Sequence, residues 1–279
     1  MKRLKWTFGT VMAFLISCNS HASPETYNRP APPVQKAVNE QYVPDTGFRS
    51  VHILVALCDN TFQGIVPVPP KIGNGQQPQS NLYWGCGYGI KSYFKKSAEW
   101  TLIRSIVIDS IKMQRLIFKH VSKKVYMVAD AYNGKYIMNC TVDFLNSCAG
   151  KFKDTVHADS HVIGINGGSD LLCYIGHDGL MDFDLPDTFS NTDGLKRDCI
   201  ILACVSKSYF SPFISKAGAN PLVWTTGLMC PEAYTVHDAI SGYVRNETPE
   251  QVRSRAAQAY SRYQKCGLKA ARNLLVTGF

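Results

Sequence analysis

Short apolar runs alternate along this chain with segments that have helical periodicity. The run VHILVAL at residues 51–57 is continuous and rich in β-branched residues, which is typical of a strand buried in a parallel sheet. Further strands are predicted at residues 100–103, 115–121, 124–130 and 221–227, and in the apolar parts of 171–179 and 198–206. Helices are predicted at residues 81–97, 136–148 and 249–266. This alternation predicts an α/β fold, a mostly parallel sheet flanked by helices on both faces.

Local signals mark the ends of these helices. Asn81 can cap the first, and Gly150 follows the second at the position of a left-handed cap. Pro249 stands in the opening turn of the third.

The N-terminus has the layout of a secretory signal. Basic residues precede an apolar segment, residues 7–16, that is too short to span a bilayer. Cleavage has two open alternatives: LISC ends at Cys18 like a bacterial lipobox, and SHA ends at Ala22 like an ordinary site. The lipobox is preferred, and it makes Cys18 a lipidated anchor, the only membrane contact expected.

These signals divide the chain into three parts. Residues 1–22 are the predicted signal peptide, residues 23–48 a disordered proline-rich tether, and residues 49–279 one α/β domain. The expected location is the periplasm or cell envelope, or the exterior if the protein is simply secreted.

Composition restricts the function further. The net charge of +9 is modest and spread along the chain, and no nucleic-acid module is recognisable, so no nucleic-acid partner is expected. Ten cysteines in an exported chain permit disulfides. Without Cys18 nine remain, so eight could pair if one stays a free nucleophile. No CxxC or zinc-ligand spacing occurs, and GINGGSD at 164–170 lacks GxGxxG, so neither a metal nor another cofactor is expected. HADSH at 157–161 is interpreted as a loop.

Two apolar runs end in chemically active residues. YIGHDG contains His177 and IILACVS contains Cys204. Ligands gather at the carboxyl ends of strands in open α/β sheets, so neighbouring strands would bring imidazole and thiol to one edge. A histidine can take the thiol proton and return it to a leaving amine. Singly, each residue has a plainer interpretation, a structural histidine or a buried cysteine.

This order of motifs resembles the caspase-haemoglobinase fold, which includes caspases, metacaspases, legumains, gingipains, clostripain and separases. The resemblance implies a caspase-like three-layer sandwich with His177 as acid/base and Cys204 as nucleophile. In the family, the backbone N–H of a glycine directly after the histidine joins that of the cysteine in the oxyanion hole. Here Asp178 has that place and Gly179 follows, so Gly179 and Cys204 are the expected donors.

Three acidic residues have two interpretations each. Asp59 directly follows the first strand, where members such as metacaspases resemble this chain in placing an aspartate that binds lysine or arginine. The preferred interpretation is that Asp59 only caps a turn. Asp182 and Asp184 could orient the His177 ring, but a solvated acidic loop is preferred.

The resulting prediction is an exported cysteine endopeptidase whose partner is a peptide or protein substrate, with cleavage after basic residues as one specificity. The alternative is a catalytically inactive caspase-like binding or scaffolding protein of the cell envelope.

Overall fold

A computed structural model describes residues 43–186 and 188–279. The predicted signal peptide, lipidation at Cys18 and most of the tether lie outside these residues. Within the described ranges, no helix combines the length and apolar character needed to cross a bilayer.

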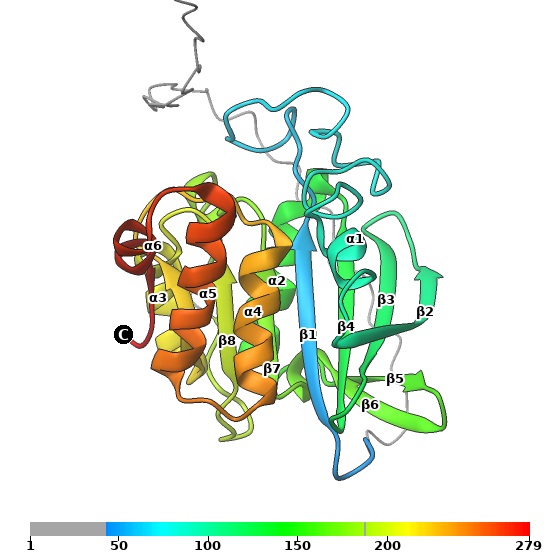
Figure 1. Ribbon diagram of the computed structural model, residues 1–279. Helices are drawn as coiled ribbons and strands as arrows, with labels where there is room; N and C mark the ends of the chain where they lie inside the picture. Colours follow the sequence, from blue (N-terminus) through cyan, green and yellow to red (C-terminus); the bar gives the residue numbers. More distant parts are fainter. Residues whose placement is uncertain (1–42, 187) are drawn as a thin grey trace, which may run out of the picture. The chain divides into compact units, whose positions relative to one another are not determined.

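The centre of the domain is an eight-stranded sheet in the order β10-β9-β8-β7-β1-β4-β3-β2 (Figure 1). Its strands are β1 (Arg49–Ala56), β2 (Trp100–Val107), β3 (Lys112–His120), β4 (Val125–Tyr132), β7 (Leu171–Ile175), β8 (Asp198–Leu202), β9 (Asn220–Thr225) and β10 (Leu275–Val276). Strands β4, β1, β7, β8 and β9 pair in parallel, whereas β2, β3 and β10 are antiparallel to their neighbours. The carboxyl ends of the five parallel strands therefore meet at one edge.

Helices cover both faces of this sheet, so the predicted α/β class is confirmed. They are α1 (Ile90–Phe94), α2 (Ile137–Cys148), α3 (Ser206–Ala217), α4 (Ala233–Val244), α5 (Pro249–Gln264) and α6 (Leu268–Leu274), with short 3-10 turns η1 (Gly134–Tyr136), η2 (Asn166–Gly168) and η3 (Gly179–Met181). Alternate residues of β1 point to opposite faces of the sheet and so into two different cores. Val51, Ile53 and Val55 pack in one core with α1, α4, α5 and α6. Leu54 and Ala56 pack in the other with α2 and α3.

The predicted helix at 81–97 is wrong over most of its length. Only α1 is helical, and the preceding residues form turns. Asn81, expected as a helix cap, instead ties this segment to the end of β1. Its side chain accepts from the N–H groups of Cys58 (3.2 Å) and Tyr83 (3.1 Å) and donates to the Cys58 carbonyl (2.8 Å). Buried polar side chains of this kind fix a loop by satisfying its backbone.

The predicted loop at 157–161 is also wrong. Strands β5 (Asp154–Ala158) and β6 (His161–Ile165) form an antiparallel hairpin whose turn holds Asp159 at φ 53°. Val156 and Ile163 pack against the sheet near β3 and β4. The other two helix predictions agree with α2 and α5, and Gly150 has φ +78° as predicted.

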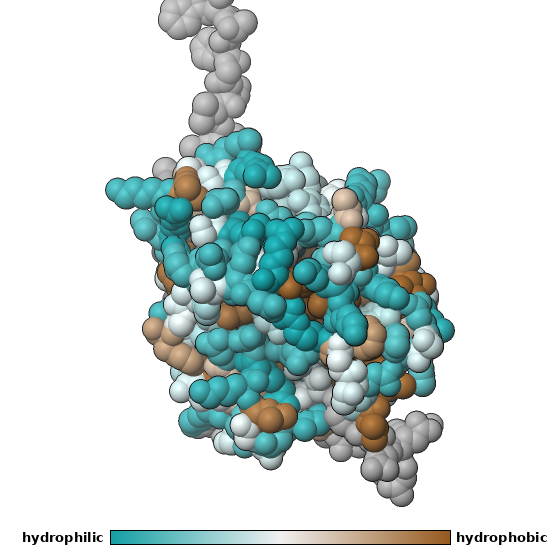
Figure 2. All heavy atoms as spheres, turned by 60° about the horizontal axis from the view of Figure 1, so that its bottom comes forward, coloured by the Kyte–Doolittle hydropathy of each residue, from teal (hydrophilic) through white to brown (hydrophobic). Residues whose placement is uncertain are grey.

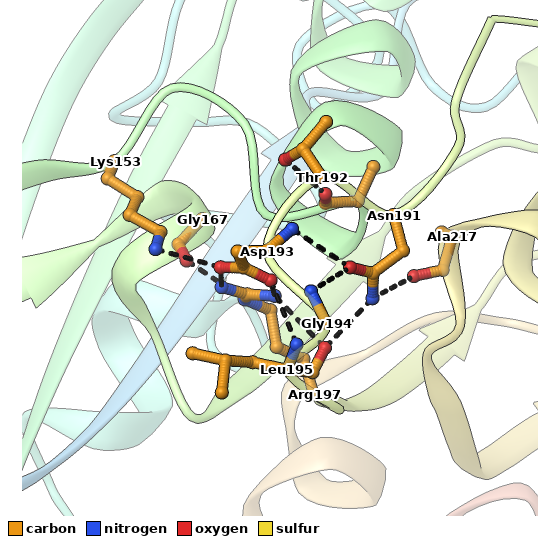
Figure 3. Close-up of polar contacts among 10 residues, drawn as sticks. Lys153, Gly167, Asn191, Thr192, Asp193, Gly194, Leu195, Arg197 and Ala217 are labelled. Atoms are coloured by element: carbon orange, nitrogen blue, oxygen red, sulfur yellow. Dashed lines mark hydrogen bonds and ion pairs between the residues drawn. The ribbon is translucent and has the colours of Figure 1, made fainter.

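The long connection between β7 and β8 is fastened by an ion cluster (Figure 3). Arg197 is 4% exposed and donates through two nitrogens to Asp193, at 2.5 and 3.1 Å, and through Nε to the Gly167 carbonyl. Lys153 adds a second cation 2.8 Å from Asp193. Asn191 accepts from the N–H groups of Asp193 (3.1 Å) and Gly194 (2.7 Å). Every charge in this cluster has a partner of opposite sign.

Within the described residues, no disulfide joins any two of the nine cysteines, so the expectation of paired cysteines gains no support. Nor do residues 43–186 and 188–279 gather three or more His, Cys, Asp or Glu side chains in a way that could hold a metal ion.

Candidate active site

His177 and Cys204 follow adjacent parallel strands. Strands β7 and β8 pair in register from Leu171↔Asp198 to Ile175↔Leu202, and the Gly176 N–H extends the pairing to the Leu202 carbonyl (3.2 Å). His177 and Cys204 each stand two residues beyond the last pair, at equivalent positions on strands about 4.8 Å apart. The sequence prediction that their strands are neighbours is therefore confirmed.

The histidine turn requires a glycine before it. Gly176 has φ +148°, and a Cβ there would lie 2.7 Å from the Ala56 carbonyl oxygen. This backbone region and this close approach to β1 are both open only to glycine.

Tyr174 stabilises the same turn through a hydrogen bond. Its hydroxyl is fully buried, donates to the His177 carbonyl (2.9 Å) and lies 3.3 Å from the Thr141 hydroxyl. The expected role of the Gly179 N–H at the oxyanion stays a prediction.

The His177 ring is oriented by a carboxylate. Its Nε2 lies 2.8 Å from Asp182 Oδ2, which also accepts from the Gly64 N–H (2.9 Å). Partial burial acts to raise the pKa of Asp182, but the hydrogen bond and charge of His177 outweigh it and leave the pKa below its ordinary value. The preferred interpretation of Asp182 as only a solvated loop residue is wrong, because its carboxylate pairs with the ring, whereas no contact joins Asp184 to the ring among the described residues.

Gly64 connects the loop after β1 to this pair. A Cβ on Gly64 would lie 2.4 Å from Asp182 Oδ1, so only glycine allows the carboxylate to approach the backbone so closely. The loop and the histidine are therefore coupled through one carboxylate.

Asp178, the residue after His177, is buried. Its Oδ1 accepts from the Leu180 N–H (3.0 Å), whereas Oδ2 has no hydrogen-bond partner among the described residues. Burial raises the pKa of Asp178 to about 7, and the nearby Asp182 adds to the shift. The backbone N–H of Asp178 donates to no acceptor in the described part of the chain.

Cys204 stands at a strained turn between β8 and α3. Val205, the next residue, has φ 52° and ψ 26°, a left-handed conformation that a β-branched side chain rarely adopts and that costs about 1–3 kcal/mol. Buried hydroxyls hold the turn in place. The Ser206 N–H donates to Thr225 Oγ1 (3.0 Å), the Thr225 N–H donates to Ser206 Oγ (3.0 Å), and Thr225 Oγ1 donates to the Ala203 carbonyl.

The Cys204 sulfur is partly exposed and touches the chain after β9. It accepts from the Met229 N–H (3.4 Å) and lies 3.6 Å from the Met229 carbonyl oxygen. The amino end of α3 follows two residues later and carries partial positive charge, which stabilises a thiolate nearby.

Asp59 serves the loop after β1. It is 1% exposed, and its Oδ1 accepts from the N–H groups of Thr61 (2.8 Å) and Phe62 (3.2 Å). Its Oδ2 accepts from Gln76 Nε2 (2.5 Å). The turn-capping role is therefore observed, and the substrate-binding role stays a prediction.

Several positioning residues escaped sequence reasoning, namely Gly64, Tyr174, Val205, Ser206 and Thr225. Of these, Tyr174 was the easiest to find from the sequence. It lies in the segment YIGHDG, and a buried tyrosine hydroxyl needs a hydrogen-bond partner nearby. Nothing local marks Val205 as left-handed.

A polar cavity of 330 Å³ lies at the opposite edge of the sheet, where Arg49, Asp198 and Asn220 begin their strands. Figure 2 brings the lower side of Figure 1 forward and shows mostly hydrophilic side chains there. Arg49 donates to the Val244 carbonyl (2.8 Å) and Asn220 donates to Asp198 (2.7 Å), so these groups already serve the fold.

No family model matches this chain, and no curated protein or solved structure is found to be similar to it.

Proposed function

We propose that the protein is a cysteine endopeptidase in which Cys204 attacks a peptide carbonyl and His177 transfers the proton. The observation that carries the proposal is the register of β7 and β8, which brings both residues to equivalent positions at one edge. Neither residue alone would justify it, since each has a plain structural interpretation.

The proton transfer uses the ring nitrogen that Asp182 leaves available. With Nε2 hydrogen-bonded to Asp182, Nδ1 remains to accept the thiol proton. The thiolate then adds to the carbonyl carbon, and the protonated ring returns the proton to the leaving amine. Water, deprotonated by the same ring, hydrolyses the acyl-enzyme. Asp182 holds the ring orientation and stabilises the imidazolium.

The oxyanion of the tetrahedral intermediate needs backbone donors. The Cys204 N–H is one expected donor, as in the resembled family. We assign the second role to Asp178, because it directly follows His177, where the resembled family has its donor glycine, and its N–H has no acceptor among the described residues. Asp178 can replace the family glycine because its side chain is buried and points away from solvent. Such preorganised donors are usually a large part of catalysis.

The caspase-like assignment of the fold belongs to the same proposal, and it rests on the histidine and cysteine following neighbouring parallel strands. Export, with lipidation at Cys18 as one route, also stays a proposal and rests on the pattern of residues 1–22.

A thiol-reactive peptide electrophile tests the proposed dyad in the folded protein. We expect one label at Cys204, lost in Cys204→Ala and at least tenfold slower in His177→Ala. Cys230→Ser is the matched control, because Cys230 is a second partly exposed thiol nearby. Labelling that survives Cys204→Ala, or ignores His177→Ala, contradicts the proposal.

One observation favours the alternative, a catalytically inactive binding or scaffolding protein. The position after His177 carries Asp178 where the resembled family has glycine. Under this alternative the Cys204 thiol reacts no faster than a small-molecule thiol, and no peptide is hydrolysed.

A further inference from the structure

Glu232 is a half-buried carboxylate held by neutral groups. Its Oε2 accepts from the Tyr234 hydroxyl (2.9 Å) and Gln264 Nε2 (3.4 Å). Among residues 43–186 and 188–279, no Lys, Arg or His forms an ion pair with it. Burial raises its pKa, whereas the hydrogen bonds of Tyr234 and Cys230 act in the opposite direction. A carboxylate in this state gains from any cation that reaches it.

Glu232 lies close to the candidate nucleophile. Met229, whose N–H and carbonyl contact the Cys204 sulfur, is three residues before it in the chain. Burial raises the pKa of Cys230, and the Glu232 carboxylate and the Cys204 sulfur both add to that shift. Glu232 thus belongs to the segment after β9 whose backbone contacts the Cys204 sulfur.

The loop after β1 also approaches Glu232. The N–H of Ala233, the next residue, donates to the Tyr88 carbonyl (2.8 Å), and Glu232 adds to the effect of burial in raising the pKa of Cys86. Lys71 acts on the Cys86 thiol in the opposite sense but forms no ion pair with Glu232 in the described residues. The carboxylate is therefore bounded by residues from two loops at the carboxyl edge of the sheet.

Aromatic rings adjoin the carboxylate. Tyr234, which donates to Glu232, stacks on Tyr263 with centroids 4.2 Å apart, and Tyr88 meets Tyr234 edge-on at 5.7 Å. Tyr88 is 48% exposed, so one ring of this cluster faces solvent. A tyrosine face beside a carboxylate attracts ammonium and guanidinium groups.

We propose that Glu232, together with Tyr88, forms the pocket that binds a lysine or arginine side chain next to the bond attacked by Cys204. The inference rests on the proposed function and names its substrate class. It assigns to Glu232 the role that the sequence offered to Asp59. The Asp59 carboxylate is 1% exposed and accepts three hydrogen bonds from its own loop, whereas Glu232 is only half-buried and lies beside the exposed Tyr88.

Turnover of matched peptides tests the pocket. The probes are fluorogenic peptides with arginine or its neutral isostere citrulline before the scissile bond. We expect the wild type to prefer arginine at least tenfold in kcat/KM, and Glu232→Gln to reduce that ratio to about one. Tyr88→Ala, at an exposed position, should reduce it partially. Asp184→Asn, the loss of an exposed carboxylate on the same connection as His177, should leave the ratio unchanged.

A binding measurement makes the test independent of turnover. Calorimetry on Cys204→Ala with the same two peptides should give tighter binding of the arginine peptide, and the difference should vanish in Cys204→Ala/Glu232→Gln. Equal binding of both peptides, or a preference that survives Glu232→Gln in a variant with native circular dichroism, overturns the inference. Absence of hydrolysis together with a Glu232-dependent preference rejects the peptidase and retains the cation pocket.

Discussion

Two groups of carboxylates on the connection between β7 and β8 have opposite electrostatic character. At its far end Asp193 is paired with Arg197 and Lys153. At its near end Asp178 has an unpartnered oxygen, and Asp182 has only the His177 ring and one backbone N–H. Completely paired charges fix a chain segment, whereas incompletely paired ones retain the capacity to bind or transfer a proton. The comparison indicates that Asp193 stabilises the fold, whereas Asp178 and Asp182 remain able to take part in binding or proton transfer.

Removing the paired carboxylate should have the largest effect. Asp193→Ala leaves the buried Arg197 guanidinium without its counter-ion, so we expect the free energy of unfolding to fall by about 3–5 kcal/mol. Urea denaturation measures it. Asp159→Ala removes an exposed ion pair with Lys119 and should change less than about 1 kcal/mol. An equal decrease in the free energy of unfolding in the two variants would mean that the ion cluster does not stabilise this connection.

The second prediction concerns the pH dependence from Asp178. Because burial raises its pKa from 3.8 to about 7, the folded state keeps a proton that the unfolded chain releases. Stability should therefore decrease as pH rises from about 4 to 7, by roughly 3 kcal/mol, and then level off. Asp178→Asn keeps an acceptor for the Leu180 N–H and removes this slope. Denaturation midpoints across pH 4–8 measure it, and parallel curves for the two proteins would contradict the burial argument.

The third prediction is that Asp182→Asn impairs reactivity more than stability. Loss of the charge that orients His177 should reduce kcat/KM, and the rate of Cys204 labelling, about 10²-fold. Asp184→Asn is the matched control and should leave both rates unchanged. If the two variants label equally fast, the carboxylate does not act through the ring.

The smallest effect is expected from Tyr174→Phe. Losing the hydroxyl removes the support of the His177 carbonyl and should lower the free energy of unfolding by about 1–2 kcal/mol. Tyr132→Phe removes an equally buried hydroxyl that donates to Asp143 instead. Both variants should lose stability, but only Tyr174→Phe should slow labelling of Cys204. Slower labelling in Tyr132→Phe as well would indicate a general loosening.

The sequence was sufficient for much of the sheet, because its strands are continuous apolar runs. VHILVAL marked β1, and the runs before His177 and Cys204 marked β7 and β8. Hairpin β5–β6 was missed although Thr155–Ala158 alternate polar and apolar residues, because its histidine spacing was considered as a metal motif instead. Helical spacing misled at 81–97, where Asn81 bonds to Cys58 from a distant strand, a contact that no local pattern encodes.

The candidate site was predictable only where chemistry and strand ends coincide. His177 and Cys204 are reactive residue types at such ends, but Asp182 could not be separated from Asp184 by composition. The difference between them is the close approach of Gly64, which is 118 residues away in the chain from Asp182. Glu232 was missed for a similar reason, since its neighbours come from the loop after β1.

The strand order also bears on how the domain folds. Strands β2, β3 and β4 are consecutive and antiparallel, whereas β1 pairs with β4 and β7, which are remote in sequence. Local pairing has a lower loop-closure entropy, so we expect the amides of this meander to become protected first during refolding. Pulse-labelling hydrogen exchange would detect this, and earlier protection of β7 and β8 would contradict it. Cys204 and His177, which follow β8 and β7, would then come together late in folding, after the meander has formed.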